Sequence, residues 1–479
     1  MATVSLKRLS HADVKTIPVE PVEPKAREQA AAILADVRAH GEAGFLRQCV
    51  KLRDLASADA PYVRTRAELK AAFEALDAGD RALLRRTGDR IRAFAEAQRG
   101  AIGEAEIAVP GGRAGHEIAP MDSAGCYAPG GRYPLPSSVL MTAITARVAG
   151  VKHVWVASPH PQPVTLAAAY VAGADALLAA GGAQAIGVLA YGLACGKGAS
   201  ADGSVAAVPA CDVIVGPGNK WVTAAKSLVN GRCTIDMLAG PSECLVLADA
   251  HADPSVVAAD LLAQAEHDVV ARPILVACAP GGDAAAAERI AAAVDAELNA
   301  QLATLPTADV ARASCGANGI AVCVTSVDDA VDVCDRFAPE HLEVMMDGDG
   351  PAGVGSRAVA AKLNHYGGLF VGARAAEVMG DYGAGPNHVL PTGGTARYTG
   401  GLSVFTFLRV RTWLRLDGGG AGGGAGGGAG AGGEDAAQAM VRDTVRLARL
   451  EGLEGHARAA EKRLADGGAG AAAKRQKTE

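Results

Sequence analysis

Long apolar runs and a strong charge imbalance are both absent from this sequence. No apolar segment reaches the about 20 residues that a membrane-spanning helix requires, and the first 22 residues lack an apolar signal core. The formal net charge is -6 over 479 residues, which gives no bulk attraction to nucleic acid or an anionic membrane. We therefore expect no membrane or nucleic-acid partner and a cytoplasmic protein, with the plastid stroma as the alternative if residues precede Met1.

Aromatic residues and paired cysteines are also scarce. Aromatics make up 4% of the chain although hydrophobic residues make up 49%, so Ala, Val and Leu must build the interior. None of the ten cysteines forms a Cys-x-x-Cys pair, which argues against a thiolate zinc cluster and a disulfide framework. We expect a reduced intracellular protein in which Cys126 and Cys244, which adjoin the motifs below, are buried thiols rather than nucleophiles.

The pattern changes along the chain from helical windows to alternating strands and helices. Residues 1–105 predict an N-terminal helical arm. Beyond it, short apolar runs such as 153–158 and 213–215 alternate with helical windows, which predicts parallel α/β sheets. We expect two incomplete Rossmann-like domains, a nucleotide-binding-like one at 106–235 and one with the catalytic residues at 236–398.

The C-terminal residues 399–479 predict a helical extension with a low-complexity insertion. Residues 418–433 are almost pure Gly and Ala. Such a run cannot bury enough apolar surface to become ordered, so we expect a flexible loop. The basic cluster at 474–477 is too weak a signal for nuclear import to carry a functional assignment.

Three glycine-rich turns precede helices in the first α/β region. They contain Gly130-Gly131, Gly181-Gly182 and Gly216-Pro217-Gly218. Backbone N–H groups at a helix N-terminus attract anionic phosphates. An ordinary tight turn explains any one of them, and none forms a Gly-x-Gly-x-x-Gly fingerprint. Together they indicate a ligand that carries phosphate.

Potential metal ligands occur at a helix end and in a loop. Gln264 and His267 lie three residues apart on a predicted helix and so share one face. An amide oxygen and an imidazole can both ligate a divalent metal, although a polar helix end is the simpler interpretation of either alone. Asp381, in a loop rich in Gly and Pro, can complete such a shell or form a turn.

Glu340 and His341 follow Pro339 and place two titratable groups at one turn. An imidazole of ordinary pKa, about 6.5, can remove a hydroxyl proton, and a carboxylate can activate water. The alternative is a helix N-terminus after Pro with a favourable Glu.

Glu451 and His456 lie on the last helical window. Five residues separate them, which places them about 140° apart on an ideal helix. They can share a site only if Gly452 and Gly455 distort the helix, or if the site wraps around the helix end.

Taken in order, these motifs resemble the histidinol dehydrogenase family over residues 106–464. The stretches that carry the resemblance are Tyr127-Ala-Pro-Gly-Gly-Arg, Gly181-Gly-Ala-Gln-Ala-Ile, Val215-Gly-Pro-Gly-Asn-Lys, Asp236-Met-Leu-Ala-Gly-Pro-Ser-Glu, Gln264-Ala-Glu-His, Pro339-Glu-His-Leu, Gly380-Asp-Tyr, Pro386-Asn-His-Val-Leu-Pro-Thr-Gly-Gly-Thr-Ala-Arg and Glu451-Gly-Leu-Glu-Gly-His. Many separate motifs in one order are far more specific than any single pattern.

The resemblance implies a homodimeric enzyme, dependent on zinc (Zn2+) and NAD, that ends histidine biosynthesis by oxidising L-histidinol to L-histidine through L-histidinaldehyde. It implies the zinc ligands Gln264, His267, Asp381 and His456, and around the substrate also Ser242, His341 and Glu451. It implies that Tyr127, Gln184 and Asn219 line the NAD site.

The same resemblance implies roles for the catalytic pair and for the C-terminal extension. His341 would remove the alcohol proton in the first step, and Glu340 would activate water on the aldehyde in the second. His456 would reach the active site of the other subunit, so the two chains would share their active sites.

Two other interpretations stay open. Relatives of the family oxidise other small alcohols, such as sulfopropanediol, with a similar metal shell, and residues 132–136 and 457–464 depart from the pattern of many members. Residues 385–397 resemble true histidinol dehydrogenases more closely, so we favour histidinol. The other interpretation is a silent nucleotide-binding or scaffold protein, against which the Glu340-His341 pair and four potential ligands argue.

Overall fold

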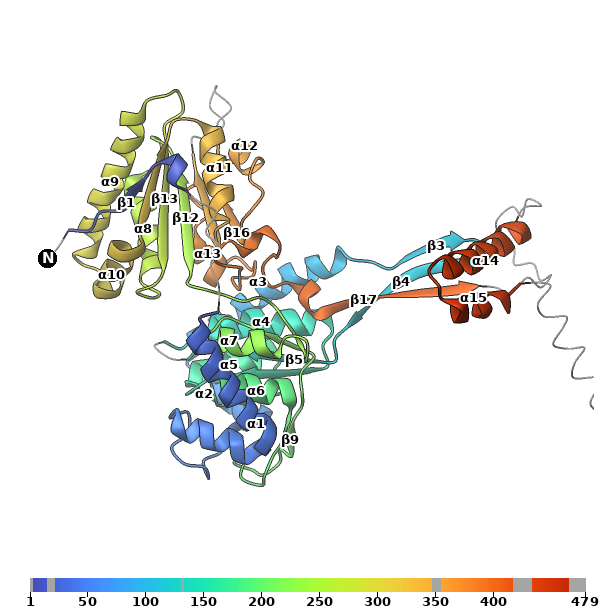
Figure 1. Cartoon of the computed structure of the whole chain (residues 1–479). Helices are drawn as coiled ribbons and strands as arrows, with labels where there is room; N and C mark the ends of the chain where they lie inside the picture. Colours follow the sequence, from blue (N-terminus) through green and yellow to red (C-terminus); the bar gives the residue numbers. More distant parts are fainter. Residues whose placement is uncertain (1–2, 15–21, 131–132, 347–354, 417–432, 465–479) are drawn as a thin grey trace, which may run out of the picture. The chain divides into compact units, whose positions relative to one another are not determined.

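The structure is a computed structural model that describes residues 3–14, 22–130, 133–346, 355–416 and 433–464 (Figure 1). The predicted Gly/Ala loop, apart from Gly433, and the basic cluster at 474–477 lie outside the described residues. The chain falls into two compact units. The first comprises residues 1–100 and 120–408, and the second residues 101–119 and 409–479.

The first unit contains a six-stranded sheet with the order β11-β10-β5-β6-β7-β2. Its strands are β2 (Val63–Thr65), β5 (Ser123–Tyr127), β6 (His153–Ala157), β7 (Ala176–Leu178), β10 (Val213–Val215) and β11 (Thr234–Ile235). All neighbours pair in parallel except β2, which joins β7 antiparallel at the edge. The predicted parallel α/β class is therefore confirmed for this half.

Helices cover both faces of this sheet because successive side chains of a strand point in opposite directions. They are α1 (Pro24–Lys51), α2 (Arg66–Ala75), α3 (Ala78–Gly100), α4 (Pro136–Ala149), α5 (Pro163–Ala172), α6 (Gly182–Tyr191) and α7 (Lys220–Val229). Val154 and Val156 of β6 enter a core with α4 and α5. Trp155 and Ala157 enter the opposite core with α1, α6 and α7. Each fully buried Val or Leu contributes roughly 1.5–3 kcal/mol to such a core.

A second six-stranded sheet in the same unit is entirely parallel, with the order β1-β14-β13-β12-β15-β16. Its strands are β1 (Lys7–Leu9), β12 (Glu243–Ala248), β13 (Arg272–Cys278), β14 (Ile320–Val324), β15 (His341–Met345) and β16 (Gly368–Val371). The helices around it are α8 (Pro254–Ala265), α9 (Ala284–Leu302), α10 (Ala308–Asn318), α11 (Val327–Phe337), α12 (Ser356–Ala360) and α13 (Glu377–Tyr382).

The residues predicted as one N-terminal arm are divided between the two sheets. β1 pairs with β14, so Lys7 lies opposite Ile320, whereas α1 packs against α6 and α7 of the other sheet. A short hairpin of β8 (Leu193–Ala194) and β9 (Ala207–Val208) also belongs to this unit. Within the part of the chain that the structure describes, no helix could cross a membrane.

The strand order reverses once in each sheet, between β5 and β10 and between β12 and β15. In open α/β sheets, the crevice outside the carboxyl ends of the strands at such a point is the usual ligand site. In the first sheet, a Cβ on Gly216 would lie 2.0 Å from the Tyr127 carbonyl oxygen, and Gly216 has a φ of +112°. Only glycine fits there, so the ends of β5 and β10 approach closely.

The second unit contains a three-stranded sheet and two helices. The strands are β3 (Ala105–Val109), β4 (Gly112–Pro120) and β17 (Leu408–Leu416), in the order β17-β4-β3, and the helices are α14 (Gly433–Leu450) and α15 (Glu454–Glu461). A small cluster of Val445, Ala448, Ala457 and Ala460 holds α14 against α15. Residues 399–479, predicted as a helical extension, therefore also supply the strand β17.

Candidate active site

A cluster of buried carboxylates and imidazoles lies at the amino ends of strands in the second sheet. Glu243 is the first residue of β12, and His341 is the first residue of β15. The two strands are neighbours, with Cys244 opposite His341. In a parallel sheet the helices return to this same edge, so Gln264, near the end of α8, also lies here.

His341 has one nitrogen fixed and one free. Its Nδ1 lies 3.0 Å from the Glu243 carbonyl oxygen. Because a carbonyl oxygen can only accept, Nδ1 carries the proton and Nε2 presents a lone pair. Among the described residues Nε2 has no hydrogen-bond partner. Burial lowers the pKa of His341 to about 3, so the ring is neutral at pH 7.

Glu340 lies beside this ring and accepts from the backbone N–H of Glu243 at 3.0 Å. Its Oε2 is 3.8 Å from His341 Nδ1, and the Ser242 side chain lowers its pKa in part. Burial raises the pKa of Glu340 well above its ordinary value, and the charges of Glu243 and Asp381 add to that effect. A carboxyl group with a raised pKa is suited to proton transfer near neutral pH.

Three side chains form a potential metal site next to this pair. Ligand atoms of His267, Glu377 and Asp381 all lie within 4.8 Å of one another. Burial raises the pKa of Asp381 to about 7, and burial and then the charges of Asp381, Glu343 and Glu340 raise that of Glu377. A divalent cation would stabilise these carboxylates in their ionised form, so the donor set fits a metal.

Gln264 also faces this group. The hydrogen bonds around its side chain are best satisfied when the amide nitrogen donates to Glu377 Oε2 (3.3 Å) and to the Glu243 carbonyl oxygen (3.2 Å). The amide oxygen is then available as a ligand atom. Residue His267 is exposed in this chain, yet the protein around its ring lowers its pKa, which favours the neutral form that binds metals.

Sequence reasoning missed Glu377 and His388. Glu377 lies four residues before Asp381 on α13, so the i, i+4 spacing of the two acids was a usable signal. His388 lies in the stretch from Pro386 to Arg397 that resembles the family, and the sequence indicated no role for it. Its Nδ1 is 3.1 Å from the Asp381 carbonyl oxygen and its Nε2 is 3.4 Å from Ser138 Oγ, and burial lowers its pKa to about 4.

The three residues expected to line an NAD site lie at the carboxyl edge of the first sheet. Tyr127 ends β5, and its hydroxyl accepts from Gly182 N–H at 3.2 Å. Gln184 lies in the first turn of α6. Asn219 follows β10 and caps α7 by accepting from Trp221 N–H and Val222 N–H, each at 3.1 Å. The structure thus brings them to the carboxyl edge of the sheet, where open α/β sheets usually bind ligands.

Glu451 and His456 lie in the second unit, and both are exposed there. Gly452, with a φ of +76°, follows the end of α14 at Leu450. The predicted single helical window is therefore interrupted at Gly452, whereas Gly455 lies within α15.

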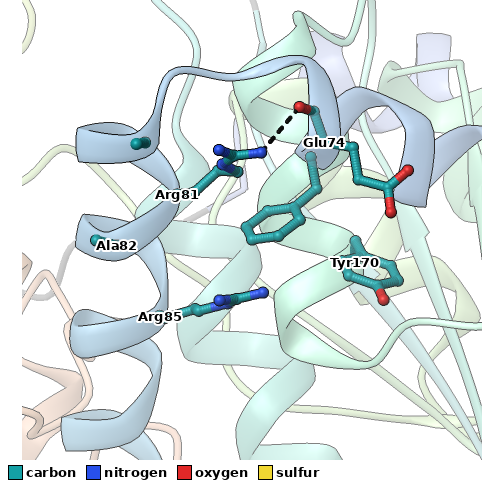
Figure 2. Close-up of a pocket in the computed structure, with 7 residues that line it drawn as sticks. Glu74, Arg81, Ala82, Arg85 and Tyr170 are labelled. Atoms are coloured by element: carbon teal, nitrogen blue, oxygen red, sulfur yellow. Dashed lines mark hydrogen bonds between the residues drawn. The ribbon is translucent and has the colours of Figure 1, made fainter.

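A separate pocket of about 450 Å³ lies between α2, α3 and α5 (Figure 2). Its lining residues are Phe73, Glu74, Ala78, Arg81, Ala82, Arg85 and Tyr170. The Arg85 guanidinium lies 4.9 Å from the Phe73 ring centroid, and Arg81 donates to the Glu74 carbonyl oxygen. Neither the residues of the carboxylate–imidazole cluster nor those expected to line the NAD site line this pocket, so we assign it no catalytic role.

Comparison with known proteins agrees with this arrangement. The family model for histidinol dehydrogenase matches residues 20–464. The chain is 38% identical to the histidinol dehydrogenase of Cupriavidus pinatubonensis over 97% of this chain and 98% of that protein. It is 41% identical to the Thermus thermophilus enzyme over 91% and 94% of the two chains.

A solved structure has the same fold. The crystal structure of histidinol dehydrogenase from Elizabethkingia anophelis matches with a TM-score of 0.80 at 25% identity, covering 97% of this chain and 99% of that one. The family match spans both α/β sheets, apart from the edge strand β1, and includes the carboxylate–imidazole cluster. The chain therefore belongs to the histidinol dehydrogenase family of oxidoreductases.

Proposed function

We propose that this protein oxidises L-histidinol to L-histidine through L-histidinaldehyde, with zinc and NAD, as the last steps of histidine biosynthesis. One observation carries the proposal beyond family membership. A neutral imidazole with a free Nε2 and a carboxyl group of raised pKa lie side by side, next to a set of N and O metal donors.

The donors near His341 fit zinc, which accepts nitrogen and oxygen ligands and keeps an open position in catalytic sites. In the proposal, Gln264, His267 and Asp381 hold zinc together with the partner subunit's His456, and Glu377 orients Gln264. When bound, zinc supplies a Lewis acid that orients and polarises the substrate, and NAD supplies a hydride acceptor for both oxidations.

The residues of this chain then move protons. His341 Nε2 takes the hydroxyl proton of histidinol, because Nδ1 is held by the Glu243 carbonyl oxygen. Burial makes the ring a weak base, and Asp381 Oδ1, 3.8 Å from Nε2, would stabilise the imidazolium that forms. Glu340 takes a proton from the water that adds to the aldehyde carbon, since a carboxylate with a raised pKa is the stronger base. Ser242, beside Glu340, positions the substrate.

The first sheet supports NAD binding in the proposal. Tyr127 and Asn219 lie at and just after the carboxyl ends of β5 and β10, the two strands that flank the reversal of strand order, and Gln184 follows β7, two strands from β5. This is where α/β sheets bind nucleotides. Tyr127 supplies a ring face and a hydroxyl, and the two amides supply donors and acceptors.

Exposed apolar side chains of the second unit support a homodimer. Leu447 and Leu450 of α14 are 59% and 74% exposed, and Val410 and Leu414 of β17 are 57% and 63% exposed. Apolar surface of this kind is typical of a protein interface. We propose that it packs on a second copy, so that Glu451 and His456 complete the partner's site.

The test is NAD reduction with L-histidinol, followed by absorbance of NADH, with and without a zinc chelator. We expect two NADH per histidinol and loss of activity with the chelator. A zinc-loaded protein that is inactive on L-histidinol but reduces NAD with sulfopropanediol or another small alcohol would overturn the proposed substrate. A protein that holds no zinc and reduces no NAD would overturn the enzymatic proposal.

A further inference from the structure

A carboxylate from a distant segment lies on the first turn of α6. Asp54 Oδ2 accepts from Gly181 N–H at 3.0 Å and from Gln184 Nε2 at 2.6 Å. The Asp54 backbone N–H donates to the Cys49 carbonyl oxygen at 2.8 Å, which fixes the residue to the end of α1. Asp54 is half-buried, so it is held in place and still reaches solvent.

This contact changes the interpretation of the turn at Gly181 and Gly182. The sequence predicted that its amides attract phosphate, but the Gly181 N–H donates to Asp54 and the Gly182 N–H donates to Tyr127. The positive end of the α6 dipole thus already faces a carboxylate. The structure gives Asp54 no ion pair with a described lysine or arginine, so its charge would repel a second anion.

The polar atoms left at this edge are mainly acceptors. Gln184 is 2% exposed and Ser158 is 1% exposed, and neither Gln184 Oε1 nor Ser158 Oγ has a hydrogen-bond partner among the described residues. The hydrogen bonds from Gly181 and Gln184 both end on Asp54 Oδ2, which leaves Oδ1 to accept. Hydroxyl groups can donate to such atoms, whereas a phosphate at neutral pH has almost no proton to donate.

These atoms belong to one continuous wall. A Cβ on Gly181 would lie 2.8 Å from the Pro159 side chain, and a Cβ on Gly130 would lie 3.1 Å from Ser158 Oγ. Segments after β5, β6 and β7 therefore touch one another, with Asp54 bonded to the last of them. The ligand class that fits is a vicinal diol without an attached phosphate.

We propose that Asp54 is a specificity-determining residue that accepts hydrogen bonds from the ribose hydroxyls of the adenosine half of NAD and excludes the 2′-phosphate of NADP. The proposal rests on the proposed NAD-dependent function. In this proposal, Asp54 discriminates between the two cofactors. Gln184 is held by the same carboxylate and contacts the ligand with its free Oε1.

The test is calorimetric binding of two cofactor fragments, ADP-ribose and 2′-phospho-ADP-ribose, to the full-length protein. The variants are Asp54→Asn, which keeps the shape and removes the charge, and Asp54→Ser, which shortens the side chain. The matched control is Asp59→Asn, since Asp59 is an exposed acid in the same loop. Thermal melts check that each variant is folded.

We expect the wild type and Asp59→Asn to bind ADP-ribose and to discriminate strongly against the 2′-phosphorylated fragment. Asp54→Asn and Asp54→Ser should lower the ratio of the two affinities at least about 10-fold, the size of one charge-assisted hydrogen bond. Steady-state kcat/KM values for NAD and NADP should shift in the same direction.

An unchanged affinity ratio in a folded Asp54 variant would overturn the proposal, as would a wild type that binds neither fragment. The proposed function fails separately. A wild type that discriminates between the fragments through Asp54, but does not oxidise L-histidinol, would support the role of Asp54 and overturn only the substrate.

Discussion

His341 donates from Nδ1 to the backbone carbonyl oxygen of Glu243 at 3.0 Å, and this one contact decides which ring nitrogen can accept a proton. The bond joins the first residues of two neighbouring strands that are 98 residues apart in sequence. Because the strands are held in register by the sheet, the ring cannot rotate without losing a buried hydrogen bond, which costs about 1–3 kcal/mol.

Separate removal of the two proton-transfer groups should affect different steps. We expect His341→Ala to lower kcat for L-histidinol more than for L-histidinaldehyde, and Glu340→Ala to do the reverse, each by about 100- to 10,000-fold in its own step. The measurement is NADH formation with each substrate supplied separately. An inverted pattern would reassign the two roles.

Removal of metal donors should lower zinc content. We expect His267→Ala, Asp381→Asn and His456→Ala each to reduce zinc well below about one per chain, measured by plasma mass spectrometry after dialysis. His153→Ala is the matched control, because His153 is an exposed imidazole at the start of β6. Full zinc content in all three variants would count against the proposed ligands.

Gly216 should tolerate no side chain. A Cβ there would lie 2.0 Å from the Tyr127 carbonyl oxygen at a φ of +112°, so we expect Gly216→Ala to lower Tm and weaken NAD binding. Gly231→Ala is the control, because Gly231 has a φ of +101° with nothing within 4 Å of an added Cβ. The Gly231→Ala variant should lose only the about 1–3 kcal/mol of stability that backbone strain costs. Equal effects of the two changes would argue against the close approach.

A buried ion pair should be needed to hold the Gly216 turn. Lys226 and Asp236, 3% and 0% exposed, form a salt bridge. Lys226 Nζ donates to the Gly216 carbonyl oxygen at 2.9 Å, and the Gly216 N–H donates to Asp236 Oδ2 at 2.7 Å. We expect Lys226→Met to cost about 3–5 kcal/mol in urea unfolding, since it leaves a buried charge unpaired. The double variant Lys226→Met with Asp236→Asn should recover part of this loss.

Acid should remove a stabilising contact within α1. Hydrogen bonds from Arg47 and Gln48 lower the pKa of Asp36. The contribution of ionised Asp36 to folding stability is therefore fully present above the ordinary carboxyl pKa, and it is lost as the pH falls through the lowered pKa. We expect Asp36→Asn to lower Tm by about 2–4 °C at neutral pH. The difference from wild type should shrink below about pH 3, and a difference that grows in acid would contradict this.

The sequence was informative wherever a property depends on neighbours in the chain. The apolar run at 213–215 became β10 because three buried residues between turn signals suit a strand covered on both faces. The helix predicted to carry both Gln264 and His267 ends at Ala265, so His267 lies just beyond α8, yet both residues lie near Glu377. By contrast, β1 is only three residues long, begins with two basic residues and has a partner strand more than 300 residues away, so no local pattern marks it as part of a sheet.

The alternation of strands and helices and the family could be predicted from the residues alone, because both follow from local spacing and motif order. The tautomer of His341, the raised pKa of Glu340, the position of Glu377 beside Asp381 and the contact of Asp54 with α6 could not. They depend on desolvation and on hydrogen bonds between distant segments, which arise only when packing brings those segments together.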